Sequence, residues 1–164
     1  MGTRTGLLIG ALFLLLVACS NEPKQESAGV PVSPTTTAPA APDCREAEET
    51  ADDIFALSLV ATEAKGEGFS RTLKKLGDAI SDMIFYVANV EGYLEDYGAY
   101  EGGDDCLSRI AKAEAVAVSA VGIGEDQAAK AYQLLLRYYP ESADALDAEN
   151  FLAKYGYPIP ESSN

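Results

Sequence analysis

Apolar residues recur every three or four positions along most of the chain from residue 43 onward. This spacing is typical of helices that bury one face, and no stretch shows the strict alternation of a half-buried strand. The most regular segment is 70–97, which would extend roughly 42 Å as a helix. The pattern therefore predicts an all-α domain. The predicted stripe of this long helix consists of Leu73, Leu76, Ile80, Met83, Ile84, Val87, Val90, Leu94 and Tyr97.

Breaks in the pattern divide the domain into about five helices. "KGEG", "GAYEGGDD", "GIG" and Pro140 supply the stops, and Asp43 and Ser142 are suited to cap helix starts. Connections this short predict antiparallel neighbours, and hence an up-and-down bundle that ends in a hairpin. The predicted helices are 43–64, 70–97, 105–121, 125–138 and 142–155. The predicted inner faces of the first and third are Ala47, Ala51, Ile54, Leu57, Ser58 and Ala61, and Leu107, Ile110, Ala111, Ala117, Val118 and Val121.

A separate apolar run occupies residues 6–17, after the single charge of Arg4. The run is shorter than the roughly 20 residues of a spanning helix and has the length of a secretory signal. Its end, Leu16-Val17-Ala18-Cys19, resembles the lipobox of bacterial lipoproteins. The resemblance implies that residues 1–18 are a signal peptide and that Cys19 carries acyl chains such as palmitate. The alternatives are an ordinary signal peptide with a chance cysteine and an uncleaved anchor.

Residues 19–42 are rich in Pro, Thr and Ala, with "VPVSPTTTAPAAP" at their centre. Such a composition buries too little apolar surface to fold, so this segment is expected to be a disordered tether for an acidic helical domain at 43–164. In lipoproteins of bacteria with two membranes, a residue such as Ser20 after the lipidated cysteine favours the outer membrane. The expected location is therefore the bacterial cell envelope, and the outer membrane if the source has two.

Charge limits the partners of the domain. Residues 43–164 hold 24 Asp and Glu against 10 Lys and Arg, in a chain whose formal net charge is −14. This excess disfavours nucleic acid, whose phosphates would be repelled, and anionic lipid surfaces. A basic protein surface or divalent cations would be attracted.

The chain has three cysteines, an unusual number for an exported protein. If Cys19 is lipidated, Cys44 and Cys106 remain as a pair in an oxidising compartment, where a disulfide is expected. Both follow an aspartate at a predicted helix start, and the first and third helices of an up-and-down bundle start at the same end. A pair of reactive thiols at helix N-termini is the alternative.

Residues 128–156 resemble a tetratricopeptide-type helical hairpin of bacterial envelope proteins. The resemblance rests on Ala128, Ala131 and Tyr132, on the turn Tyr139-Pro140-Glu141-Ser142, and on Ala145, Ala148 and Leu152. It implies a surface that binds peptides or partner proteins. A generic hairpin with a Tyr-Pro turn is the alternative, because no second copy follows at a 34-residue spacing.

The sequence offers little for catalysis. It has no histidine, which excludes Ser-His-Asp and Cys-His arrangements. Glu101, Asp104 and Asp105 lack the ligand spacing of an EF-hand, so a solvated turn is predicted in place of a metal site. We therefore expect no catalytic residue, no metal and no cofactor, and the protein is not expected to be an enzyme.

Tyrosine usage is the remaining signal, with nine tyrosines and no tryptophan. Tyrosine suits surfaces that are wet when free and buried when bound. A partner surface is therefore predicted at Tyr86, Tyr93, Tyr97, Tyr100, Glu91 and Glu95, with packing of these rings inside the bundle as the alternative.

Together these features predict a membrane-anchored envelope lipoprotein that acts as a non-catalytic protein-interaction or scaffold module. Its expected partners are the membrane, through the lipid on Cys19, and another envelope protein. The alternative is a small-ligand or cation-binding lipoprotein with a pocket between helices.

Overall fold

The computed structural model describes residues 38–161, which form five α-helices and no strand. The all-α prediction is confirmed. The helices are α1 Arg45–Glu63, α2 Glu67–Tyr97, α3 Gly103–Val121, α4 Glu125–Tyr138 and α5 Ala145–Tyr155. The predictions for the signal peptide, for Cys19 and for most of the tether lie outside the described residues.

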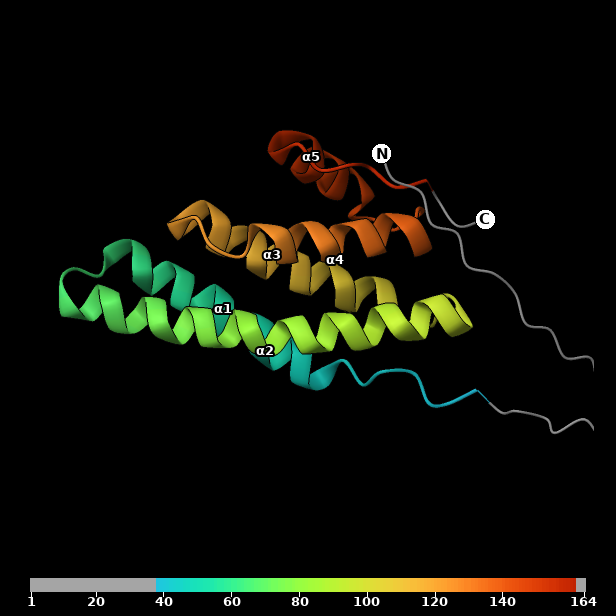
Figure 1. Ribbon diagram of the computed structural model, residues 1–164, viewed down its shortest axis with the longest axis horizontal. Coiled ribbons are helices and arrows are strands. Elements are labelled where there is room, and N and C mark those ends of the chain that lie inside the picture. The colour runs from blue at the N-terminus through green and yellow to red at the C-terminus, as the bar shows by residue number, and fades with distance from the viewer. Residues whose placement is uncertain (1–37, 162–164) are drawn as a thin grey trace, which may run out of the picture. The chain divides into compact units, whose positions relative to one another are not determined.

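The helices form the predicted up-and-down bundle, in which α1 to α4 reverse direction one after another (Figure 1). α1 packs against both α2 and α3, α3 packs against α4, and α5 packs mainly against α4. α2 has smaller contacts with α4 and with α3. Consequently α3 is enclosed on most sides, whereas one long flank of α2 has no helix beside it.

The core contains most of the residues predicted to face inward. On α1, every predicted inner residue is buried except Leu57, which is half-buried. On α2 the buried arc is narrower than the predicted stripe, because Ile84 and Tyr97 are 41% and 47% exposed. The reason is that α2 is covered chiefly by α1, with α4 reaching only one flank. The buried residues of α2 are Leu76, Ile80, Met83, Val87, Val90 and Leu94.

A carboxylic acid, Glu114, lies in the middle of the buried face of α3. Its side chain is 0% exposed, and neither carboxyl oxygen has a hydrogen-bond partner. Burial raises the pKa of Glu114 to about 8, because the charged form loses its water and gains no partner. Glu114 is therefore mostly protonated at neutral pH and is the least favourable side chain of the core.

The predicted disulfide fixes one end of the bundle. Cys44 and Cys106 are bonded, with their Cα atoms 5.9 Å apart, and they join the starts of α1 and α3. Cys106 is buried, and the hydroxyl of Tyr86 on α2 lies 3.3 Å from its sulfur. Three helices therefore meet at this disulfide.

The turn between α4 and α5 is attached to α3 by Asp144. This residue takes the N-cap position of α5 that Ser142 was predicted to occupy. Its carboxylate accepts a hydrogen bond from the Ser108 hydroxyl and another, at 2.6 Å, from the Lys112 ammonium. The bond from Lys112, followed by that from Ser108, lowers the pKa of Asp144. The hairpin is thus held to the bundle by a charge as well as by packing.

Candidate functional site

The most distinctive surface feature is a groove between α1 and α2 that is lined by carboxylates. It encloses about 360 Å³. None of its eight lining residues is basic, so the negative charge along it is uncompensated by its own walls. The groove is lined by Glu46, Ala47, Glu49, Thr50, Asp53, Asp82, Met83 and Tyr86. We call it the acidic groove.

Helical spacing places these acids together. Glu46, Glu49 and Asp53 follow one another at intervals of three and four residues, so they share one side of α1. That side borders the buried residues Ala47 and Ala51, and the acids therefore edge the seam with α2. Asp82 adds a carboxylate from the α2 side.

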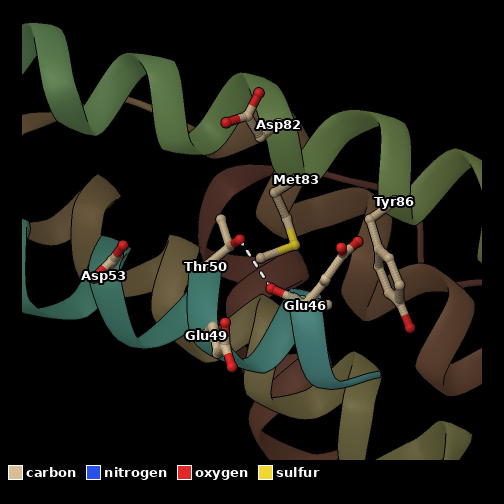
Figure 2. A pocket seen from close by; sticks show the side chains of 8 residues that line it. Glu46, Glu49, Thr50, Asp53, Asp82, Met83 and Tyr86 are labelled. Carbon is tan, nitrogen blue, oxygen red and sulfur yellow. Dashed lines mark hydrogen bonds between the residues drawn. The ribbon is translucent and has the colours of Figure 1, made fainter. Parts of the chain in front are cut away.

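The floor of the acidic groove is apolar, because Ala47 and Met83 are buried beneath it. Thr50 donates its hydroxyl to the Glu46 carbonyl oxygen at 2.9 Å (Figure 2), and the Tyr86 hydroxyl lies 3.3 Å from the Cys106 sulfur. The acids are therefore the main polar groups that remain for a ligand. Figure 2 also shows the Glu46 carboxylate reaching toward α2, beside Met83 and Tyr86. Chemically the acidic groove is an array of acceptors that suits ammonium or guanidinium groups above an apolar floor.

A second depression continues from the acidic groove toward the beginning of the described chain. It is lined by Asp43 and Arg45 together with Glu46 and Glu49, which belong to both. Arg45 is bound to Asp43 at 2.7 Å, and this bond lowers the pKa of Asp43. The positive charge at this end is therefore already engaged.

The four predicted tyrosines gather near the end of α2 and the disulfide. Tyr93 contacts Tyr97 and Tyr100, with ring centroids 5.0 and 5.4 Å apart. Tyr100 is half-buried, and its hydroxyl has no hydrogen-bond partner. Burial raises the pKa of Tyr100 to about 12 and is also the main cause of the raised pKa of Tyr86. We call Tyr86, Tyr93, Tyr97, Tyr100 and Tyr139 the tyrosine cluster.

Tyr139, which was not among the predicted surface residues, joins the cluster from the end of α4. Its hydroxyl accepts a hydrogen bond from the Tyr100 amide at 3.0 Å and donates one to the Tyr100 carbonyl at 3.2 Å. Only Tyr97 in this group is largely exposed. The cluster is therefore mostly internal packing between α2, α4 and the turn before α3.

The two predicted acids of that surface lie elsewhere on α2. Glu91 forms an ion pair with Lys130 of α4. Glu95 is exposed on the helix. Neither appears among the residues around the tyrosine rings, so the structure does not bring the six predicted residues into one surface.

Gly103 should be intolerant of a larger side chain, because a β-carbon there would lie 2.0 Å from the Tyr139 hydroxyl oxygen. We expect Gly103→Ala to lower the free energy of unfolding by about 2 kcal/mol, as overpacking generally does. Urea denaturation followed by circular dichroism measures this change. Gly68→Ala is the matched control, since Gly68 also lies in the first turn of a helix and nothing lies within 4 Å of its β-position. Equal stability of the two variants would contradict the packing described here.

Candidate metal ligands are dispersed. Glu101 lies in the turn before α3, and Asp104 and Asp105 lie in its first turn. Among residues 38–161 no group of three or more acidic, histidine or cysteine side chains is placed to hold a metal ion. In the same residues, no helix has both the length and the apolar character needed to cross a membrane. No family model, no curated protein and no solved structure matches this chain.

Proposed function

We propose that this chain is a lipid-anchored protein of the bacterial cell envelope and that its helical domain binds another envelope protein without catalysis. The observation that carries the proposal is the acidic groove, in which four carboxylates face solvent with no basic residue in the lining. The matching partner is a protein segment rich in Lys and Arg with some apolar side chains. Complementary charge of this kind favours fast and specific encounter.

The N-terminal sequence supports the anchoring half of the proposal. The lipobox-like end of the apolar run would place a diacyl anchor on Cys19, and the Pro- and Thr-rich segment would link it to the domain. Attachment to a membrane raises the local concentration of the domain near other envelope proteins. At that raised local concentration, weak contacts in the acidic groove are sufficient to bind a partner.

The proposal is tested by placing a photo-reactive amino acid at Thr50 of the full chain and irradiating intact cells. We expect a covalent adduct with a basic envelope protein, and at least a tenfold loss of this adduct in Glu49→Lys/Asp53→Lys. The control Glu149→Lys/Glu161→Lys makes the same change in charge at two exposed positions outside the acidic groove. An equal loss in both double variants, or no adduct at all, would count against a basic partner in this groove.

The alternative, binding of a small cation or ligand, is favoured by the same carboxylates. Calorimetric titration of the full chain with calcium and with spermine separates the two functions. Saturable binding that disappears in Glu49→Lys/Asp53→Lys, together with a missing protein adduct, would favour the alternative.

In either case Cys19→Ser should remove the chain from the membrane fraction if the anchor is as proposed.

A further inference from the structure

The flank of α2 that faces away from α1 displays apolar side chains to solvent. Phe85 is 73% exposed and Ile84 is 41% exposed, whereas the buried residues of the same helix lie on a different side. A shallow groove of about 220 Å³ runs beside them, lined by Ile84, Val87 and Ala88 and by residues of α4. The helix thus has a second apolar face that no element of residues 38–161 covers.

This second face has an apolar centre, small residues on either side of it, and one charged residue at each end. At about 100° per residue, its members fall within roughly a 100° arc of the helix, and each is exposed or half-exposed. We call it the outer stripe. The outer stripe is Lys74, Gly77, Ser81, Ile84, Phe85, Ala88, Gly92 and Glu95.

The two glycines of the outer stripe have no role within the domain. A β-carbon at Gly77 or Gly92 would have nothing within 4 Å, and neither residue has a positive φ. Glycine inside a helix is less favourable than alanine, so nothing in the folded domain accounts for these two. What glycine adds on a helix surface is the close approach of another backbone.

The order of residues in the outer stripe is symmetric about the bond between Ile84 and Phe85. Reading outward, the first positions on the two sides are Ala88 and Ser81, and the next are Gly92 and Gly77. The outermost are Glu95 and Lys74, which carry opposite charges. An antiparallel copy of the same helix would therefore meet small residues with small residues and a cation with an anion.

We propose that the outer stripe is the interface of an antiparallel homodimer. The two-fold axis passes beside Ile84 and Phe85, which pack against the same residues of the second copy. Ser81 faces Ala88 of the second copy, Gly77 faces its Gly92, and Lys74 faces its Glu95. Such a self-complementary patch is the property that a two-fold dimer interface requires.

Charge and symmetry select a second copy over a different partner. Lys74 is bonded to Asp78 one turn away, but both side chains are largely exposed, so the ammonium can also reach Glu95 of the second copy. The net charge of −14 disfavours association of two copies, and the two symmetric Lys74–Glu95 contacts offset part of that repulsion locally. The outer stripe is about 33 Å long and only one helix wide, so it would bury less surface area than a standard interface. The dimer is therefore expected to be weak in solution.

The homodimer would leave the acidic groove open. That groove uses Asp82, Met83 and Tyr86 on the other flank of α2, and none of these belongs to the outer stripe. A dimer would therefore present two acidic grooves. The dimer forms through the outer stripe whatever binds in the acidic grooves.

The test is oxidative crosslinking of two differently tagged full chains in the same membranes, one carrying Ser81→Cys and the other Ala88→Cys. We expect the mixed pair to form a disulfide-linked dimer at least fivefold faster than either variant alone. Ser81→Cys mixed with Asn89→Cys is the matched control, because Asn89 is exposed but lies outside the outer stripe. Lys74→Glu should slow crosslinking several-fold, and adding Glu95→Lys should restore it.

Each other result overturns the proposal. Faster crosslinking within Ser81→Cys alone would indicate a parallel or different contact, and an equal rate with Asn89→Cys would indicate random collision. Products only of another mass would assign the outer stripe to another protein. An unchanged rate in Lys74→Glu would remove the charge contact that selects the second copy. None of these results bears on the Thr50 adduct, so the dimer and the acidic groove are tested separately.

Discussion

Glu114→Met is expected to stabilise the bundle at pH 8 by on the order of 4 kcal/mol and to abolish a pH dependence that the native chain should show. Glu114 is fully buried without a hydrogen-bond partner, and burial raises its pKa from 4.5 to about 8. Methionine is similar in length and flexible, and it has no charge to desolvate. The gain therefore comes from removing a cost and not from adding a contact.

The sign follows from where each state releases its proton. The unfolded chain loses the Glu114 proton near pH 4.5 and the folded chain near pH 8, so between these values the folded state holds more protons. The free energy of unfolding should then fall by up to about 1.4 kcal/mol for each pH unit. The stability linked to the protonated form of Glu114 is fully present below pH 4.5 and is lost as pH rises through 8.

Other shifted groups act outside this window. The pKa values of Asp43 and Asp144 are lowered by their basic partners. Their contribution to the free energy of unfolding is therefore lost only as the pH falls below the pKa of a free carboxyl group. Burial raises the pKa of Tyr100 and Tyr132 to about 12, which matters only above pH 10, where unfolded tyrosine ionises. Glu114 should therefore dominate between pH 5 and 8.

Urea titrations at pH 5, 6, 7 and 8 measure this effect, with Glu149→Met as the control at an exposed helical position. The native chain and the control should lose stability in parallel as pH rises, while Glu114→Met stays nearly level. If Glu114→Met follows the same slope as the control, Glu114 is not the titrating group. The buried acid would then have found a partner or water.

The helices themselves follow from local pattern, because each depends on periodicity and on nearby stops. α4 has the predicted bounds, and α2 begins only three residues earlier than predicted. Glu114 shows where pattern fails. Its spacing of three and four residues from Ile110, Ala111, Ala117 and Val118 places it at the centre of the buried face, yet an acid is normally assigned to solvent. Whether Glu114 is buried or exposed depends on the enclosure of α3 by its neighbouring helices.

The candidate site shows the same division between local and distant information. The acids of α1 are visible in sequence, but the acidic groove exists only because α2 packs beside them. The ring contact between Tyr93 and Tyr97 spans one turn of α2, whereas Tyr139 reaches Tyr100 across 39 residues. Glu91 likewise finds Lys130 at the same separation. Charges and rings can be located from sequence, but their partners depend on how the helices are arranged.

Loss of the Cys44–Cys106 disulfide is expected to lower the free energy of unfolding by about 4 kcal/mol, since the bond closes a loop of 62 residues in the unfolded chain. The local structure should magnify the effect on the acidic groove. Cys44 is the N-cap of α1 and makes no side-chain capping bond, so the disulfide is the covalent restraint on the first turn. Glu46 lies in that turn, and the groove should therefore open before the rest of the bundle.

Two measurements separate the contribution of the disulfide bond to stability from that of the packing of the two cysteine side chains. Cys44→Ala and Cys106→Ala should each cost about as much as the double variant, because either one removes the whole loop constraint. Hydrogen exchange of the native chain with and without reductant should show amides of α1 losing protection first, followed by the part of α2 that faces them. A Cys44→Ala variant that loses far less stability than Cys106→Ala would assign the stability to packing of the buried Cys106. Unchanged exchange in α1 would separate the disulfide from the acidic groove.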